Sequence, residues 1–373
     1  MMREHKLPTQ PLKLLPNRVW RTYEGGLLLE AWSGAIEPKD SSFPENWIGS
    51  VIRAHNVGRE RFIEGYSRFI ASDGTEHLLK DCVERDPQAF LGKRHAEKYG
   101  TQTAVLVKAL DSSERLTIQV HPDRRFAKQN FQSDYGKTEA WYVLGGRTIN
   151  GEEPYVLLGF KQGVTREVWR RLFEEQDLES MKNALHKIPL NEGEIFLIEG
   201  GVPHAIGSGC LIIEIQEPTD LTLRTERTTP RGMLVPDHAC HQGIGFDRML
   251  DCFHYEELSY EDTMRRWKKE PRIVNTTPDG TEWKLIGECD TNCFRMYKLD
   301  ISGRYRMNGT GVFYNAIIVS GAGKIGWSYG ELSIKEGDSF FIPADCEFVQ
   351  YVREGGTKLR ILLCFPPLPP QEA

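Results

Sequence analysis

Two histidines and one glutamate, each placed at or beside an expected β-strand, are the residues of this sequence best suited to chemistry. His121 ends the run RLTIQVH, Glu139 opens the run EAWYVL, and His204 follows the run EIFLIE in the turn GGVPH. Two neutral imidazole nitrogens and a carboxylate oxygen form a ligand set that suits Zn²⁺ or another first-row divalent ion, with one coordination position left open. The three residues therefore predict a catalytic metal site.

The expected strand over residues 115–121 has an apolar and a polar face. Apolar side chains occupy the even positions from 116 to 120, whereas Thr117, Gln119 and His121 share the opposite face, because side chains alternate along a strand. A solvated sheet face would explain this pattern, but such faces more often carry Lys, Glu or Arg than Gln and His. Gln119 could add an amide oxygen to the metal site, although glutamine is an unusual zinc ligand.

Two lysines lie close to these segments. Lys137 precedes Glu139 by two residues in GKTEAW, so the two side chains share one side of the strand. Lys108 is a single cation among apolar neighbours in AVLVKAL. It either binds a phosphate or ends its strand in solvent.

Arg224 in LTLRTER follows the strand CLIIEIQ, which carries Glu214. A buried arginine is costly unless it is paired. One interpretation therefore pairs Arg224 with Glu214 or Glu226 in a structural salt bridge. The other points the guanidinium into the metal cavity, where it would stabilise a developing oxyanion or bind a phosphate.

The elements that must position these residues are mainly β-strands. The 35 glycines and 20 prolines are spread between short β-rich runs, which is typical of a β-sandwich or barrel. Helical periodicity occurs in residues 75–100 and 165–187, where Thr165 can cap the first turn, and we expect these helices to cover a β core. The strands are expected at residues 103–110, 115–121, 139–144, 194–199, 210–216, 314–321, 338–343 and 358–365.

A charged, structureless-looking passage at residues 252–275 separates two strand-rich parts. We place a domain boundary near residue 255, which gives a metal-binding catalytic domain at 1–255 and a smaller β-sandwich at 256–373. Residues 323–348 repeat the turn and strand pattern of residues 191–209, which indicates either a duplicated fold or a coincidence of turn chemistry.

Composition and motifs exclude several classes of function. With 47 basic and 53 acidic residues the net charge is −6, so the basic excess of a nucleic-acid-binding protein is missing. The sequence has no apolar run of membrane-spanning length and a charged N-terminus, which predict a cytoplasmic protein with no membrane partner. The eight scattered cysteines suit buried thiols in a reducing compartment. Nucleotide-binding and acyl-transfer motifs are missing.

Two further groups are interpreted as structural. His238 and His241 are spaced like metal ligands, but only Asp237 and Cys240 accompany them. The basic cluster at residues 265–269, RRWKK, is interpreted as a solvated face.

The ordered motifs VKALDSSERLTIQVHP, YGKTEAWYVL and GGVPHAIGSGCLIIEIQEPTDLTLRT resemble those of the type I mannose-6-phosphate isomerases, zinc enzymes of the cupin superfamily. The resemblance covers about residues 11–260. It implies a mainly β fold: a cupin or jelly-roll β-sandwich catalytic domain with helical insertions, followed by a second, smaller cupin-like β domain. The segment TERTTPRG after Arg224 departs from the family pattern.

The same resemblance implies an aldose–ketose isomerase that interconverts mannose 6-phosphate and fructose 6-phosphate through an enediol. It also implies roles for nine residues: Gln119, His121, Glu139 and His204 as zinc ligands, Arg224, Lys137 and Glu214 as catalytic residues, and Lys108 and Thr117 near the substrate phosphate. Either Lys137 or Glu214 could be the base that moves the proton. Two alternatives stay open, a non-haem iron oxygenase with a two-histidine, one-carboxylate site and a non-catalytic sugar-phosphate sensor.

Overall fold

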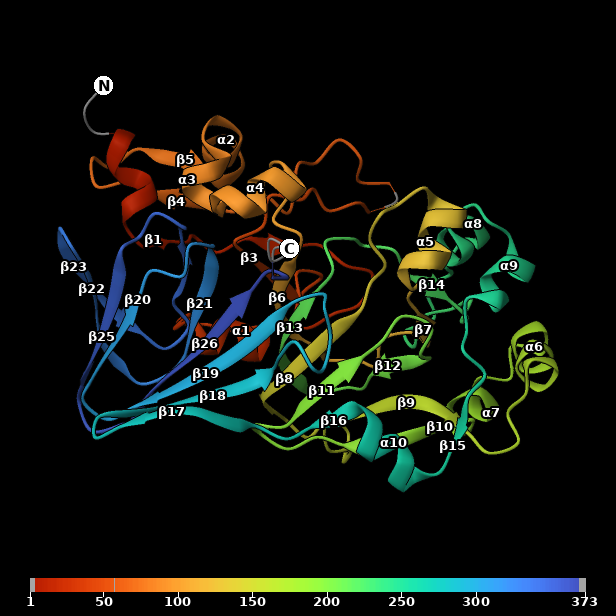
Figure 1. The fold of residues 1–373 in the computed structure, drawn as a ribbon. Helices are drawn as coiled ribbons and strands as arrows, with labels where there is room; N and C mark the ends of the chain where they lie inside the picture. Colours follow the sequence, from red (N-terminus) through yellow and green to blue (C-terminus); the bar gives the residue numbers. More distant parts are fainter. Residues whose placement is uncertain (1–3, 57, 369–373) are drawn as a thin grey trace.

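The computed structural model describes residues 4–56 and 58–368 of the chain. Within these ranges the fold is mainly β, as predicted. Four sheets are stacked through three layers of buried side chains, and short helices lie at their edges (Figure 1). No helix within the described ranges is long and apolar enough to cross a membrane.

Two neighbouring sheets carry the predicted site, and we name them the central sheet and the site sheet. The central sheet has the order β16 (Lys268–Lys269), β11 (Ile195–Ile198), β8 (Glu139–Gly146), β13 (Cys210–Gln216), β6 (Leu106–Asp111), β3 (Glu45–Ile48) and β2 (Arg18–Val19). The site sheet has the order β10 (Leu185–Pro189), β9 (Tyr155–Lys161), β12 (His204–Ile206), β7 (Gln119–Val120) and β14 (Leu223–Arg224), with β15 (Glu257–Leu258) parallel to β9.

The other two sheets form a second sandwich. The C-terminal sheet has the order β1 (Leu12–Lys13), β24 (Ser339–Ile342), β21 (Tyr314–Ser320), β26 (Leu359–Phe365), β19 (Arg295–Ile301), β18 (Gly280–Ile286) and β17 (Arg272–Thr277). The sheet that covers it consists of β20 (Arg304–Asn308), β25 (Phe348–Glu354), β22 (Ala322–Trp327) and β23 (Gly330–Lys335). A separate hairpin pairs β4 (Arg68–Ile70) with β5 (Glu76–Leu78).

The central sheet is covered on both faces, and this arrangement creates the environment of the site. On β13, Ile213 and Ile215 belong to the core shared with the C-terminal sheet, whereas Ile212 packs in the core shared with the site sheet. A strand buried on both faces reads as a nearly continuous apolar run, which explains CLIIEIQ. Glu214 and Gln216 alternate with Ile213 and Ile215 on the site-sheet side and are also buried.

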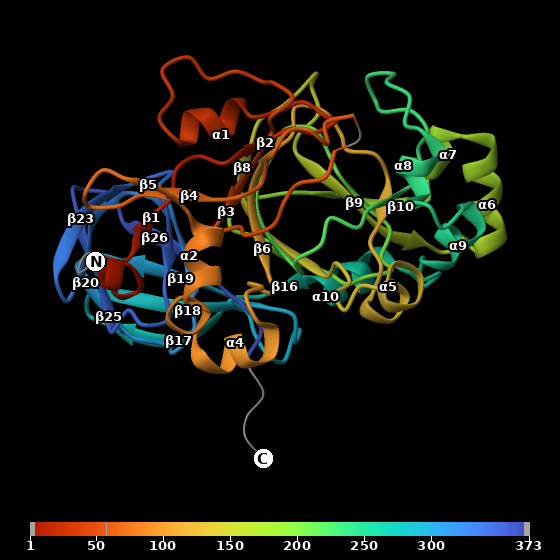
Figure 2. The same cartoon turned by 90° about the horizontal axis from the view of Figure 1, so that it is seen from above.

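The helices are short and occur between strands along the chain. Helices α6 to α9 gather at the end of the molecule opposite the C-terminal strands (Figures 1 and 2). The predicted cap of α6 is confirmed, because the Thr165 hydroxyl accepts the N–H of Val168 at 3.3 Å. The helices are η1 (Glu4–Thr9, a 3₁₀ helix), α1 (Leu27–Trp32), α2 (Leu79–Arg85), α3 (Pro87–Leu91), α4 (Lys93–Tyr99), α5 (Arg124–Phe131), α6 (Arg166–Glu175), α7 (Leu178–Asn183), α8 (Asp237–His241), α9 (Phe246–Asp251) and α10 (Tyr260–Trp267).

The passage at residues 252–275 is ordered, so the expectation of a structureless segment is wrong. It contains β15, α10, β16 and the start of β17, and Ser259 caps α10 by accepting the N–H of Asp262. The cluster RRWKK is not simply a solvated face either, because Trp267 is 2% exposed. Its ring packs where Gly159 leaves room: a Cβ on that glycine would lie 2.4 Å from the indole. The domain boundary near residue 255 stays a prediction.

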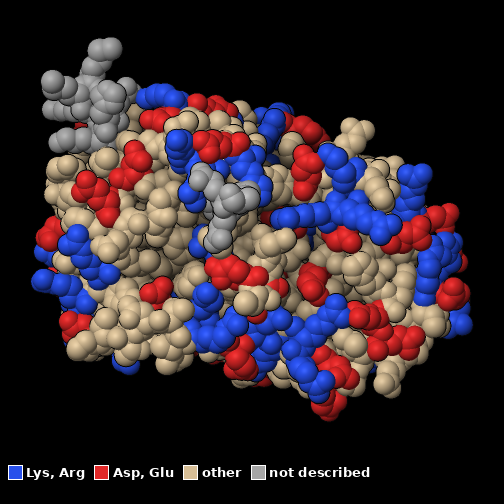
Figure 3. Space-filling model, viewed as in Figure 1, with Lys and Arg blue, Asp and Glu red and all other residues tan. Residues whose placement is uncertain are grey.

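Charged side chains of both signs are intermingled on the face of the molecule shown in Figure 3. This view shows no large area of a single sign over that face.

Candidate active site

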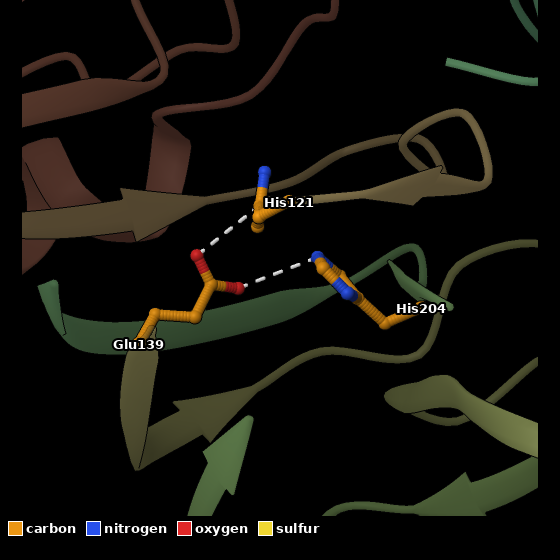
Figure 4. Close-up of side chains that lie close together, drawn as sticks. All are labelled: His121, Glu139 and His204. Carbon is orange, nitrogen blue, oxygen red and sulfur yellow. Dashed lines mark ion pairs between the residues drawn. The ribbon is translucent and has the colours of Figure 1, made fainter. Parts of the chain in front are cut away.

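His121, Glu139 and His204 converge on one point at the interface between the central sheet and the site sheet (Figure 4). One ligand atom from each lies within 4.8 Å of the others. His121 Nε2 is 3.3 Å from Glu139 Oε2, and His204 Nε2 is 3.4 Å from Glu139 Oε1. All three side chains are at most 2% exposed. The structure therefore brings together the three residues that the sequence predicted as metal ligands.

Backbone contacts orient both imidazoles toward that point. His121 Nδ1 lies 2.8 Å from the carbonyl oxygen of Leu221, and His204 Nδ1 lies 2.9 Å from that of Val202. A ring nitrogen that faces a carbonyl carries the proton, so each Nε2 presents a lone pair, which is the usual arrangement of metal-binding histidines. Lys137 Nζ is 2.8 Å from His121 Nε2, a contact that requires this nitrogen to accept.

Burial and charge keep the donors in the protonation state that a metal needs. Burial, reinforced by the Lys137 ammonium, lowers the pKa of His121 to about 3. For Glu139 burial opposes ionisation, but Lys137 and His121 outweigh it, so the pKa of this carboxyl lies well below its usual range. Glu139 Oε2 is buried and accepts no hydrogen bond, although Lys137 Nζ lies 3.2 Å away. Neutral imidazoles beside an ionised carboxylate with a free acceptor fit a divalent cation.

Gln119 lies beside the two rings. Its side-chain Nε2 is 3.2 Å from His204 Nε2 and 3.4 Å from His121 Nε2. The pairing of β7 with β12 places Gln119 directly opposite His204. Rotating the amide by 180° would bring Oε1 to the same position. Gln119 is therefore within reach of an ion held by the histidines.

A cavity of about 1100 Å³ opens in front of this group. Its lining contains six Lys or Arg residues and five Asp or Glu residues; we call eight of these charged residues the cavity floor. The cavity floor consists of Arg21, Lys108, Lys137, Arg224, Glu45, Glu139, Glu214 and Asp220. Thr117 and Gln119 also line the cavity.

The polar face of residues 117–121 is not solvated. Thr117 and Gln119 are 8% exposed and His121 is 1% exposed. They face the interior between two sheets, and this explains why the face carries Gln and His rather than the charged residues of an exposed face.

Lys108 does not end its strand in solvent, because it is 3% exposed. Its Nζ lies 3.9 Å from Glu45 Oε2 and 4.0 Å from Glu214 Oε2. Burial alone would lower the pKa of Lys108, but Glu214 and Glu45 outweigh it and raise that pKa. Lys108 is therefore a fixed cation that faces the cavity.

Arg224 makes neither of the salt bridges considered from the sequence. Glu226 pairs with Arg115 through two hydrogen bonds of 2.5 and 2.8 Å. The Arg224 guanidinium donates to the backbone carbonyls of Ala239 and Thr222, at 3.2 and 3.4 Å. None of the ion pairs among the described residues includes Arg224, so its charge stays free to meet an anion in the cavity.

Glu214 lies on the cavity floor next to Lys137. Its Oε1 is 3.9 Å from Lys137 Nζ. Burial, reinforced by the nearby Glu139 carboxylate, raises the pKa of Glu214 to about 8. The two residues considered as proton carriers therefore lie side by side.

Sequence reasoning missed three members of the cavity floor. Glu45 accepts hydrogen bonds from Tyr23 and Trp47 and pairs with Arg21 Nε at 2.9 Å. Arg21 also reaches Asp220, at 3.3 Å. The alternation of Glu45 with Trp47 on one side of a short strand was the available signal, since Trp47 is a core residue.

The other histidine pair divides between two environments. His238 is exposed and lines the cavity. His241 accepts the N–H of Gly243 at 3.0 Å and packs edge-on against Phe246. Neither belongs to the metal-ligand group found among the described residues.

Comparison with known proteins agrees with this geometry. Residues 32–140 match the family model of the phosphomannose isomerase type I catalytic domain. The chain is similar to the type I phosphomannose isomerases. A mannose-6-phosphate isomerase of Streptococcus mutans is 27% identical over 313 residues, which cover 80% of this chain and 88% of that protein.

Solved structures with a similar fold belong to the same family. The crystal structure of the mannose 6-phosphate isomerase from Bacillus subtilis matches with a TM-score of 0.73 at 21% identity, over 95% of this chain and 99% of that one. The resemblance to this family and the mainly β fold expected from the sequence are thereby confirmed.

Proposed function

We propose that this protein is a metal-dependent aldose–ketose isomerase that interconverts mannose 6-phosphate and fructose 6-phosphate. The observation that carries the proposal is the convergence of His121, Glu139 and His204 on one point beside a cavity into which Arg224 brings an unpaired charge. The relatives named above bear the same activity in their names. We further propose a cytoplasmic location, as expected from the sequence.

The four predicted ligands would hold the metal. Two imidazole nitrogens, a carboxylate and the Gln119 amide suit Zn²⁺, and other first-row divalent ions accept the same donors. When bound, the ion would act as a Lewis acid that polarises the oxygens of the substrate.

The remaining residues of the cavity floor would perform the proton transfer. Isomerisation moves a proton between C2 and C1, and charge develops on an oxygen as the enediol forms. The Arg224 guanidinium would stabilise that charge. Lys137 or Glu214 would move the proton, since the two groups lie 3.9 Å apart beside the metal ligands. Lys108 and Thr117, which also line the cavity, would lie near the phosphate.

Charge balance supports a phosphorylated substrate. The cavity lining contains six cations and five carboxylates, and Glu214, whose pKa is raised to about 8, is mostly protonated at pH 7. A divalent cation adds two positive charges, and a phosphate monoester carries about −1.5 to −2 at pH 7. The phosphate of the substrate would therefore offset the positive charge of the metal ion and of the excess cations in a poorly solvated site.

A coupled assay that detects fructose 6-phosphate tests the proposal. We expect turnover of mannose 6-phosphate that a chelator abolishes and Zn²⁺ restores. Absence of turnover in the zinc-loaded protein would contradict an isomerase. In that case, thermal stabilisation by the sugar phosphate would identify a sensor, and oxygen uptake dependent on ferrous iron would identify an oxygenase.

Replacing a ligand should remove the metal. Losing a partner outside the ligand shell typically costs about 10 to 100-fold in metal affinity, so His121→Ala should cost more than about 100-fold, and activity should fall with it. Zinc content after dialysis measures the effect. His241→Ala is the matched control, because His241 lies outside the ligand group, and it should keep the wild-type zinc content.

A further inference from the structure

Glu217 is a buried carboxylate that does not line the cavity. It is 0% exposed, and both of its oxygens have partners. Oε1 accepts a hydrogen bond from Arg124 Nε at 2.6 Å, and Oε2 accepts the backbone N–H of Thr138 at 3.0 Å. The backbone N–H of Glu217 in turn donates to the carbonyl of Thr138 at 3.0 Å. Glu217 therefore holds the backbone of Thr138 on both sides of its Cα: its side chain accepts the N–H, and its own N–H donates to the carbonyl.

Thr138 lies between two members of the cavity floor. It separates Lys137 from Glu139, so fixing its N–H and its carbonyl fixes the peptides that join it to both residues. Two residues before Thr138, the carbonyl of Gly136 accepts a hydrogen bond from the hydroxyl of Thr219 at 2.6 Å. The segment 217–219 thus holds the start of β8 at two points.

Arg124 connects Glu217 to the segment that carries His121. It begins α5, three residues after His121. Between them, the carbonyl of Pro122 accepts the N–H of Lys137 at 2.9 Å. The approach is close, because a Cβ on Gly136 would lie 2.5 Å from that carbonyl oxygen. The Glu217–Arg124 pair therefore spans the two segments that carry His121 and Glu139.

Arg124 also touches the C-terminal half of the chain. Its Nη1 lies 3.4 Å from Asn292 Oδ1, and its Nη2 lies 3.3 Å from Cys293 Sγ. These residues belong to the turn before β19 of the C-terminal sheet. The second sandwich thus contacts the guanidinium that pairs with Glu217.

We propose that Glu217 and Arg124 are positioning residues for the metal centre. The pair holds the backbone of residues 121–124 and 137–139 in the arrangement that lets His121 and Glu139 meet on one ion. Contacts outside the ligand shell usually tune metal affinity in this way, and a buried carboxylate that loses its partner is strongly destabilising to its surroundings. The proposal deepens the proposed function and rests on the metal site on which that function depends.

Zinc affinity of three variants, measured by chelator competition without substrate, tests the proposal. We expect Glu217→Gln to raise the Kd for Zn²⁺ by about 10 to 100-fold, because the amide can still accept from Thr138 but no longer pairs with Arg124. Glu217→Ala should bind Zn²⁺ more weakly still, since alanine loses both side-chain contacts. Arg124→Gln, at a side chain that is 42% exposed, should fold and show a smaller rise. The double variant Glu217→Gln, Arg124→Gln should match Glu217→Gln alone.

The visible spectrum of the Co²⁺-loaded protein and steady-state kinetics supply further readouts. Glu217→Gln should alter the Co²⁺ bands and lower kcat more than it changes KM, because the ligands move while the cavity floor keeps its charges. Asp300→Asn is the matched control: Asp300 pairs with Arg360 at 3.1 Å in the C-terminal sheet, and its loss should leave the Kd for Zn²⁺ and the spectrum unchanged.

Wild-type zinc affinity in both Glu217→Gln and Arg124→Gln would overturn the proposal, as would an equal loss in Asp300→Asn. Failure of the proposed function is a different result. If the wild-type protein binds Zn²⁺ without converting mannose 6-phosphate, the isomerase assignment fails, while the affinity measurements still decide the role of Glu217.

Discussion

The environment of Arg224 favours a functional role for this residue over a purely structural one. A guanidinium held in a protein interior is expected to face a carboxylate, yet Arg224 donates only to two backbone carbonyls. These contacts orient the side chain without neutralising it. An anion formed in the cavity would supply the missing negative charge.

Replacing this arginine should therefore slow the chemical step. Removing one donor from a developing oxyanion typically costs about 10² to 10³-fold in kcat, and we expect a loss of this size for Arg224→Ala. Arg224→Lys should recover only part of it, because lysine keeps the charge but lacks the planar fork. Steady-state kinetics measures the loss, and zinc content should stay at the wild-type level. An unchanged kcat in Arg224→Ala would contradict the role.

The convergence of His121, Glu139 and His204 could be predicted from sequence, because each lies at an end of a strong strand pattern and the motifs around them resemble those of a known family. Glu45 and Asp220 could not be found in the same way. Glu45 alternates with Trp47 on a short strand, but only the pairing of β3 with β6 and the ion pair between Asp220 and Arg21 bring these carboxylates to the cavity floor. Such pairings between distant segments leave no local signal.

At the scale of elements, strand existence was easier to predict than strand length. β13 spans residues 210–216 as expected, whereas the expected strand at 115–121 shrinks to β7, Gln119–Val120. The residues before β7 bond elsewhere: Ile118 N–H donates to Glu226, and Leu116 N–H donates to the Ile206 carbonyl. The side chains of residues 116–121 still alternate between two faces, although no regular strand pairing extends over them. The predicted faces were therefore correct, whereas the predicted strand was too long.

A hairpin at residues 228–234 forms part of the cavity wall. A bridge between Thr228 and Leu234 closes it, and Thr229, Pro230, Met233 and Leu234 line the cavity. At its tip, Arg231 pairs with Glu24 at 2.6 Å and with Glu114 at 3.0 Å. The two ion pairs attach this part of the wall to a different region of the chain.

Arg231→Ala should loosen the hairpin without unfolding the protein. Exposed ion pairs contribute about 0.2 to 1 kcal/mol each, so KM for the sugar phosphate should rise by a few-fold to about tenfold while kcat and the thermal midpoint change little. High salt should raise KM more for the wild-type protein than for the variant, because salt also screens the ion pairs that only the wild type has. Identical KM values for the two proteins at low salt would contradict this function of the hairpin.

At the scale of the whole molecule, His95 joins the α2–α4 insertion to the second sandwich. The side chain is buried, Nε2 faces the carbonyl of Gln102 at 2.8 Å, and the ring packs edge-on against Phe313. Burial lowers the pKa of His95 to about 4. The folded protein thus keeps this imidazole neutral at a pH where the unfolded chain protonates it.

Stability should consequently fall as the pH decreases from about 6.5 to about 4. Over this range the unfolded state binds a proton that the folded state excludes, which costs up to about 3 kcal/mol of unfolding free energy. In His95→Gln this contribution disappears, so the difference in unfolding free energy between wild type and variant should shrink as the pH falls. Urea unfolding at pH 7 and pH 4.5 measures it, with His238→Gln as control. A constant difference would refute the assignment.

The pairing of β1 with β24 sets an order for assembly in the cell. Leu12 and Lys13 find their partners at Phe341 and Phe340, so the first strand leaves the ribosome long before the sheet that receives it exists. At about 5 to 20 residues per second, tens of seconds separate the synthesis of β1 from that of β24. The second sandwich therefore completes its sheet with a strand made much earlier than β24, and the protein reaches its native state only after translation has passed β24.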